Sequence, residues 1–168
     1  MQETPQQYIQ RMLGLVEGKD PLQVQKTTAA NLANLIQGLD RQKLTERPGP
    51  GKWSIAEILA HLADAEVVGA WRLRLVLGQN GATIQSFDQN VWAETFNYGH
   101  RDPRVSLETF RALRASNLLL LETIPEKLWE NYGTHQERGK ETVAHIVSMY
   151  AGHDLNHLQQ VEAIAKGA

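Results

Sequence analysis

Apolar residues recur every three or four positions along most of the chain, the spacing that places them on one face of an α-helix. Strand-like alternation of useful length is not expected anywhere, and the chain shows no internal repeat. Thr4-Pro5 and Asp20-Pro21 mark two helix starts, because each places a capping side chain before a proline. The pattern predicts helices over about residues 5–17, 21–40, 54–77, 107–123 and from 141 or 142 to 165.

The third of these helices has the best-marked start. Ser54 and Glu57 form the pattern of a capping box, and Trp53 and Ile58 are placed to form the hydrophobic staple around it. We expect the helix to end at Gly78. Besides its main apolar face it carries a second line of partly polar positions, which need partners if they lie in a bundle interior: Glu57, His61, Asp64, Val68, Arg72 and Leu75.

Residues 79–105 show no sustained helical pattern apart from a short amphipathic turn over 88–94. A connection of this length is uncommon without a function. It is typical of a lid over a cleft, of the crossover that a bundle needs when consecutive helices run parallel, or of a segment that serves as both. Ser106 is the expected cap of the next helix, and Pro125 is expected to start a short turn through Trp129.

Composition limits the class of protein. A chain of 168 residues with 42% hydrophobic content is long enough for one domain, 1–168, with a core bundle over about 20–166. The sequence contains no run of 18 apolar residues that would predict a membrane span, and its N-terminus lacks the features of a signal peptide. We therefore expect a cytoplasmic protein. A formal net charge of −2, from 17 basic and 19 acidic residues, argues against a nucleic-acid partner.

The chain has no cysteine, so any metal ion must be held by histidine, aspartate or glutamate. His153 and His157 are four residues apart in the last predicted helix, and this spacing projects both imidazoles from one face. On a helical wheel this face coincides with the apolar stripe of the helix, so we expect both histidines to point into the core. Two buried imidazoles one turn apart suit a metal site, or they are core histidines satisfied by backbone or carboxylate groups.

A catalytic zinc-type site uses three protein ligands. His61 lies in the second turn of the strongly capped helix, at the edge of the core, which makes it a candidate for the third. His145 falls on the opposite face from the pair, where a surface or interhelical hydrogen bond is expected. His100 and His135 lie in predicted loops and are expected to be solvent-exposed or part of a lid.

Four short motifs occur in an order and at separations that resemble the DinB/YfiT-like superfamily of metal-dependent enzymes. They are residues 50–54 (PGKWS), 60–66 (AHLADAE), 86–93 (SFDQNVWA) and 153–157 (HDLNH), and the resemblance extends from about residue 20 to the C-terminus. It implies an all-α four-helix bundle of up-down-down-up type with a long crossover connection. It also implies a divalent metal held by His61, His153 and His157.

Three neutral imidazoles leave a divalent metal its full charge, so a bound water or thiol is readily deprotonated. The residue types do not distinguish zinc, nickel, iron and manganese. Asp64, Glu57 and Asp154 are the acidic candidates for orienting the rings. We expect a metal-dependent hydrolase or a thiol S-transferase, since relatives in this superfamily include enzymes that use bacillithiol or a related low-molecular-weight thiol. The alternative is a stress-linked, metal-binding bundle without catalytic turnover.

A small-molecule pocket is expected beside the metal. Phe87, Trp92 and Tyr150 are candidates for its walls, although such aromatic residues are more often core plugs. Arg72 shares a helical face with His61 and is expected either to meet an anionic group or to pair with a carboxylate. The wide apolar arcs of the bundle helices can leave one apolar face to be covered, and a homodimer is the assembly that would cover it.

Overall fold

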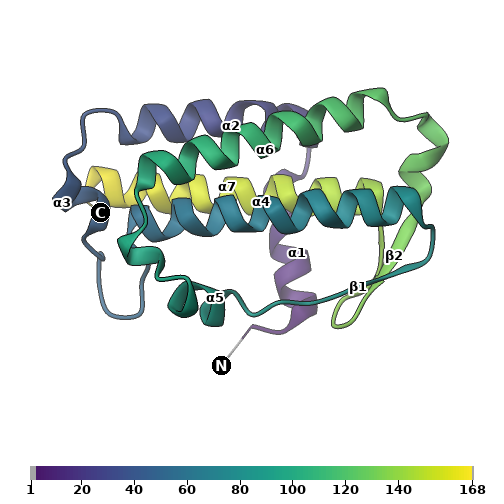
Figure 1. Ribbon diagram of the computed structural model, residues 1–168, viewed down its shortest axis with the longest axis horizontal. Helices are drawn as coiled ribbons and strands as arrows, with labels where there is room; N and C mark the ends of the chain where they lie inside the picture. Colours follow the sequence, from purple (N-terminus) through teal and green to yellow (C-terminus); the bar gives the residue numbers. More distant parts are fainter. Residues whose placement is uncertain (1–2, 168) are drawn as a thin grey trace.

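The computed structural model describes residues 3–167, and four long helices lie side by side in it (Figure 1). α2 and α7 run in one direction along the bundle, and α4 and α6 run in the other, which gives the expected up-down-down-up order. The prediction of an all-α four-helix bundle is confirmed. The bundle helices are α2 (Pro21–Ile36), α4 (Ile55–Gly78), α6 (Pro103–Thr123) and α7 (Val143–Lys166).

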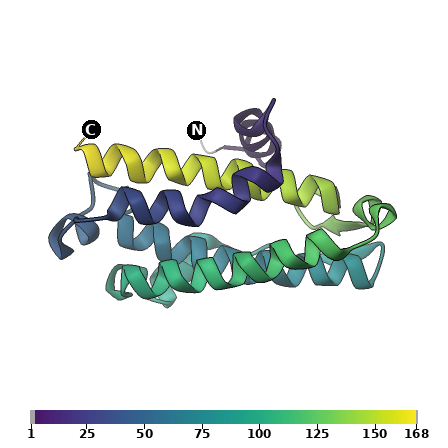
Figure 2. The same ribbon diagram turned by 90° about the horizontal axis from the view of Figure 1, so that it is seen from above.

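The parallel helices are neighbours: α4 packs on α6, and α2 packs on α7 (Figures 1 and 2). Because α4 and α6 run the same way, the chain between them must return along the length of the bundle. Residues 79–102 make this crossover (Figure 1), which includes β1 (Ala82–Ile84), α5 (Gln89–Thr95) and the 3-10 turn η1 (Tyr98–His100). The crossover alternative for this segment is therefore confirmed.

The core is divided along the bundle axis. One apolar cluster includes Ile55, Leu59 and Phe110, and a second includes Val76 and Ile146. Along the four bundle helices, a set of buried polar residues lies between the positions that contribute to these two clusters. This set, called the polar layer below, consists of Thr28, Glu66, Arg114, Asn117 and Asp154.

Several helix boundaries differ from the expected ones for local reasons. α6 starts at Pro103 with Asp102 as its cap, so the predicted start at Ser106 was wrong; Ser106 is buried within the helix. α2 ends at Ile36 rather than near residue 40, because Gly38 has a positive φ of 78° that no helix continues through. A short helix that was not predicted follows, α3 (Arg41–Thr45). The capping box of Ser54 and Glu57 is present as expected.

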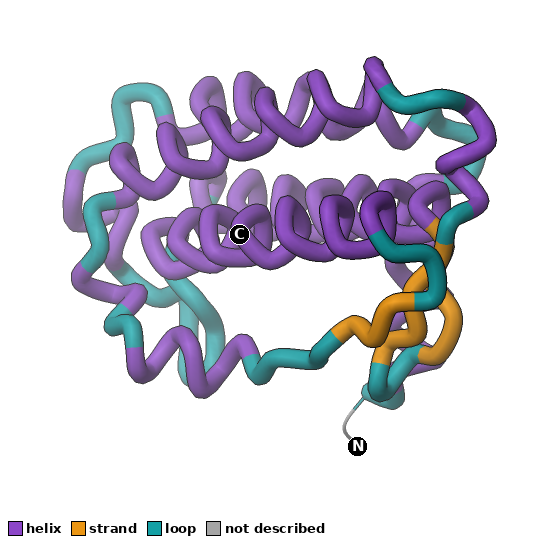
Figure 3. Tube along the Cα trace, turned by 45° about the vertical axis from the view of Figure 1, so that its right-hand side comes forward, coloured by secondary structure: helices purple, strands orange, loops and turns teal. Residues whose placement is uncertain are grey.

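Three short strands are present in the part of the chain that the structure describes, although the sequence shows no strand-like alternation of useful length. β1, β2 (Tyr132–His135) and β3 (Gly139–Thr142) form a small sheet in that order at one end of the bundle (Figure 3). β1 pairs with β2 in parallel, with Ile84 opposite His135, and β2 pairs with β3 in an antiparallel hairpin. Strands of three or four residues are too short to show an alternating pattern. Their pairing also joins the crossover to a segment about fifty residues away, which local patterning does not report.

The N-terminal helix α1 (Pro5–Val16) lies outside the bundle and crosses α7 steeply (Figures 1 and 2). The crossing is close because Gly152 has no side chain: a Cβ atom there would lie 2.0 Å from the carbonyl oxygen of Met12. Gly152 therefore lets α1 dock beside the histidine pair. The 3-10 turn η2 (Glu126–Glu130) leads from α6 to the hairpin. Within the described residues, no helix combines the length and apolar character needed to cross a bilayer.

Candidate metal centre

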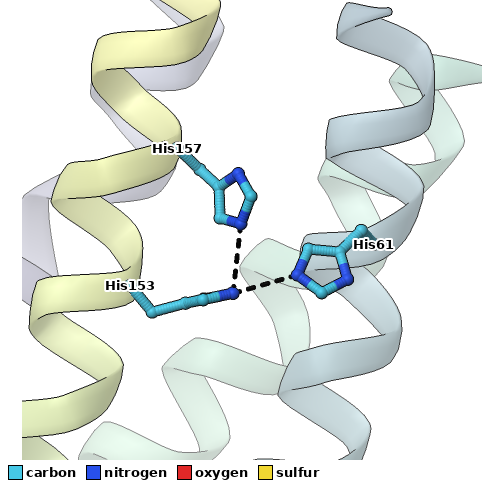
Figure 4. A group of neighbouring side chains, drawn as sticks. All are labelled: His61, His153 and His157. Atoms are coloured by element: carbon cyan, nitrogen blue, oxygen red, sulfur yellow. Dashed lines mark hydrogen bonds between the residues drawn. The ribbon is translucent and has the colours of Figure 1, made fainter. Parts of the chain in front are cut away.

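Three imidazoles from two antiparallel helices converge between α4 and α7 (Figure 4). Nε2 of His153 lies 2.9 Å from Nε2 of His61 and 3.1 Å from Nε2 of His157. One candidate ligand atom from each ring lies within 4.8 Å of the others. Metal–nitrogen bonds of about 2.0–2.1 Å place neighbouring ligand atoms about 3 Å apart, so the spacing matches that of a three-histidine site.

The helices fix this arrangement. His153 and His157 are one turn apart on α7, and His61 is in the second turn of α4, where the Ser54 capping box sets the start of the helix. His61 and His157 are 2% and 6% exposed. The Trp53 ring packs on His61 with 5.0 Å between ring centroids, which restricts the orientation of that imidazole.

The donor set suits a cation. Gln160 Oε1 accepts a hydrogen bond from Nδ1 of His157 at 2.9 Å, which leaves the Nε2 lone pair of that neutral ring facing the centre. Nε2 of His153 takes part in both short contacts but can hold only one proton or one lone pair, so one contact is left without a hydrogen bond. A cation at the point of convergence would satisfy all three nitrogens at once.

Each of the three rings is held in its neutral form. Burial lowers the pKa of His61 well below its usual value, and the nearby His157 lowers it further. Burial and the other two rings do the same to the pKa of His153. Burial lowers the pKa of His157 to about 4, although the hydrogen bond that its ring donates to Gln160 acts in the opposite direction. The lone pairs are therefore available for a metal at neutral pH without competition from protons.

The other histidines lie outside this group. His145 is on α7, half-buried, and its backbone N–H donates to the capping Thr142. His100 is exposed, as expected for a loop residue. The same expectation was wrong for His135, which is 2% exposed on β2 and faces Arg72. Its burial follows from the sheet that the sequence pattern did not reveal.

The three acidic candidates for orienting the rings contact arginines instead. Asp154 accepts from Arg114 and from the Thr28 hydroxyl, at 2.9 Å for the latter. Glu57 accepts from Arg47 and completes the capping box of α4. Asp64 accepts from Arg101 at 2.8 Å. Gln160, which does contact a site imidazole, was not among the candidates, although its position three residues after His157 is a signal that helical spacing offers.

A cavity of about 500 Å³ opens beside His61 and His153. It lies among α1, α4, α7, the crossover and the β2–β3 hairpin, and its volume is in the range of small-molecule sites. Three of the four predicted pocket residues line it: Arg72, Phe87 and Tyr150. Trp92 packs against Phe87 with ring centroids 4.7 Å apart and is behind this wall. The other lining residues are Tyr8, Ala65, Ser86, Asp88, Gln89, Asn90, Glu137, Arg138 and Met149.

The sequence profile of the DinB superfamily matches residues 25–161, which is most of the chain and includes all three histidines. The chain belongs to the DinB superfamily. The resemblance that the short motifs suggested is thereby confirmed, and the DinB bundle is the scaffold that brings His61, His153 and His157 together.

Curated relatives of this DinB-superfamily chain carry the name "Putative metal-dependent hydrolase". One from Oceanobacillus iheyensis is 26% identical over 135 residues, covering 80% of this chain and 78% of the relative. YfiT from Bacillus subtilis is 24% identical over 153 residues, covering 89% of this chain and 85% of the relative.

The solved structure of Bacillus subtilis YfiT has the same fold. It superposes with a TM-score of 0.81 at 21% identity, covering 87% of this chain and 84% of that one. That structure is described as a probable metal-dependent hydrolase with an unusual four-helix bundle topology. The likeness extends to the order of the bundle helices.

Proposed function

We propose that the protein is a metal-dependent enzyme whose divalent ion is held by Nε2 of His61, His153 and His157. The observation that carries the proposal is the convergence of three neutral imidazoles, two buried and one half-buried, whose Nε2 atoms cannot all be satisfied by hydrogen bonds to one another. The names of the relatives support the same conclusion. The chemistry supplied by such an ion is Lewis acidity, which brings the pKa of a coordinated water or thiol towards neutrality.

The surrounding residues of the protein orient the ligands and bind the substrate. Gln160 fixes the tautomer of His157, and Trp53 restricts the ring of His61. Tyr150 stays protonated at neutral pH, because burial raises the pKa of its hydroxyl to about 12. That hydroxyl donates to the Ala65 carbonyl at 3.2 Å, so Tyr150 forms a fixed wall of the cavity and is not a general base.

We propose hydrolysis as the reaction, with water activated at the three-histidine site. Thiol transfer with a low-molecular-weight thiol is the second candidate, because a metal such as zinc at this site would bind a thiolate sulfur in its open coordination position. Both reactions use the same ligands and the same cavity. They differ in whether turnover requires an added thiol.

The experiment that tests the proposal compares metal-loaded protein with a variant that lacks one ligand. Protein reconstituted with zinc, nickel, iron or manganese is assayed with an ester and an amide panel, and with a chloro-dinitroarene plus several thiols. His153→Gln is expected to abolish turnover, whereas His145→Gln, a substitution on the same helix outside the site, is expected to retain it. Bound metal without His153-dependent turnover of any substrate would leave a non-catalytic metal-binding protein as the function.

A further inference from the structure

Arg72 is a buried cation at the far side of the cavity from the histidines. It lies on α4 eleven residues after His61, which is about 16 Å along the helix axis. Both side chains line the same cavity, and small groups lie between them on α4: Ala65 lines the cavity, and the ring of Tyr150 packs directly on Gly69. A molecule that fills the cavity would therefore touch both the histidines and Arg72.

The guanidinium of Arg72 lacks a counter-charge. The residue is 5% exposed, yet within residues 3–167 no carboxylate lies at ion-pair distance from it. Its Nη2 donates to the Gln85 carbonyl at 2.8 Å, and its Nε has no hydrogen-bond partner in the described chain. An isolated buried charge is costly, and proteins ordinarily pair it.

The other arginines of the interior show the usual arrangement. Arg114, also buried, donates to the carboxylates of Glu66 and Asp154. Arg138, which lines the same cavity as Arg72, donates to Glu141 at 2.6 Å. The protein thus supplies carboxylates to these two arginines and leaves Arg72 without one.

His135 adds a second free donor beside Arg72. Its Nδ1 accepts from the backbone N–H of Glu137 at 3.2 Å, so the neutral ring carries its proton on Nε2. Burial, together with Arg138, lowers the pKa of His135 to about 4, which keeps the ring neutral. Nε2 lies 3.3 Å from Nη2 of Arg72, and neither nitrogen can accept from the other. Two donors facing each other are both satisfied by one oxyanion.

We propose that Arg72, supported by His135, is a specificity subsite for a carboxylate group of the substrate. The single positive charge of the guanidinium matches one carboxylate, and its planar edge suits bidentate binding. The substrate would then be an elongated organic acid whose reacting group is at the histidines and whose carboxylate is at Arg72. The placement of the substrate's reacting group at the histidines rests on the proposed function. The binding of its carboxylate by Arg72 does not.

Bifunctional probes test both ends together. The monohydroxamates of succinic, adipic and suberic acid place a metal-chelating group and a carboxylate at three separations, and the primary amides of the same lengths are their neutral counterparts. Dissociation constants are measured by titration calorimetry on zinc-loaded protein. We expect the best-fitting carboxylate probe to bind about tenfold or more tightly than its amide.

The preference must depend on Arg72. Arg72→Gln is expected to bind the carboxylate and amide probes equally, and Arg72→Lys is expected to keep part of the preference because it keeps the charge. Arg74→Gln is the matched control, since Arg74 lies on the same helix but is exposed and contacts Asn117 outside the cavity. Thermal unfolding of each variant verifies that it is folded. A carboxylate preference that survives in Arg72→Gln, or that is absent from the wild type at all three lengths, would overturn the proposal.

A metal-free arm separates this proposal from the proposed function. Octanoate and octanamide are titrated into chelator-treated protein, where only the carboxylate end can discriminate. Hydroxamates that bind no better with zinc than without it would contradict the metal site alone. An Arg72-dependent preference for octanoate would still support the subsite, and equal binding of octanoate and octanamide in this arm, with no probe preference in the other, would refute it.

Discussion

The polar layer and the polar residues beside the cavity lie within a few helical turns of each other, but they differ in how far their hydrogen-bonding groups and charges are paired. In the polar layer, Arg114 donates to Glu66 and Asp154, Asn117 donates to Glu66, and Thr28 donates to Asp154. Burial alone would lower the pKa of Arg114, but the two carboxylates raise it overall, so the arginine stays charged. Nearly every polar atom of this layer has a partner within the protein.

The second group consists of His61, His153, His157 and Arg72 beside the cavity, and its polar atoms are not all paired within the protein. The Nε2 atoms of His61, His153 and His157 meet at one point, where they cannot all be satisfied by hydrogen bonds to one another. Arg72 is buried without a carboxylate. Asp154 and His153 are adjacent in sequence, yet they belong to different groups. The contrast teaches that polar burial by itself does not mark a site; unsatisfied polar burial around a cavity does.

The largest effect is expected from breaking the polar layer. Arg114→Met keeps much of the side-chain volume but leaves two buried carboxylates unpaired, so the free energy of unfolding should fall by about 3–5 kcal/mol. Urea unfolding measures it. Arg111→Met is the matched control on α6, because Arg111 is exposed and its ion pair with Glu108 is worth less than about 1 kcal/mol. Equal losses in the two variants would show that the layer has no special role.

The crossing of α1 and α7 links the cavity to the bundle. Gly152→Ala places a methyl group against the Met12 backbone, so α1 must shift, at a cost of about 1–3 kcal/mol in the free energy of unfolding. Because Tyr8 on α1 lines the cavity, binding of cavity probes should weaken as well. Gly14→Ala is the control: its Cβ would meet nothing within 4 Å, so it should stabilise α1 by about 0.5–1 kcal/mol. If Gly152→Ala left the free energy of unfolding unchanged, the close docking of α1 on α7 would be contradicted.

Lowering the pH should decrease the free energy of unfolding, because His135 is buried in its neutral form. Its folded-state pKa of about 4 is below the ordinary value of 6.5, so the unfolded chain binds the extra proton between these values. The stability associated with neutral His135 is therefore fully present above pH 6.5 and is lost as the pH falls towards 4, by about 1–3 kcal/mol. His135→Gln should flatten the dependence of unfolding free energy on pH in this window. An unchanged slope would show that His135 titrates normally in the folded protein.

The smallest effect on stability is expected from replacing Arg72, the buried arginine that lacks a carboxylate partner. Arg72→Met removes an unpaired buried charge and keeps the apolar stem, so the free energy of unfolding should change by less than about 1 kcal/mol or should increase. Urea unfolding of Arg72→Met beside Arg114→Met makes the test. A loss for Arg72→Met as large as that for Arg114→Met would mean that Arg72 has a structural partner.

The bundle was predictable because its information is local. Helix starts such as Ser54 with Glu57 are encoded within four residues, and the inward face of α7 follows from helical spacing. The convergence of His61 with the histidine pair needed the fold in addition, and for that the sequence offered a resemblance to a family. The missed start of α6 was also local: Asp102-Pro103 repeats the Asp20-Pro21 signal used for α2.

The remaining features depend on contacts between distant segments. β1 and β2 are too short for a pattern and meet only once the crossover is in place, so the burial of His135 could not be predicted. Arg114 is separated by 40 residues or more from both of its carboxylates. Helical position alone therefore pointed Asp154 towards the imidazoles, whereas in the folded protein it lies against Arg114.

Metal content per chain tests the central claim most directly. The wild type, the His61→Ala, His157→Ala double variant and His145→Gln are each equilibrated with zinc or nickel, desalted and analysed by mass spectrometry for bound metal. The account predicts about one equivalent in the wild type and in His145→Gln, and essentially none in the double variant that is still folded. Metal retained by the double variant, or absent from the wild type with every ion tried, would contradict it.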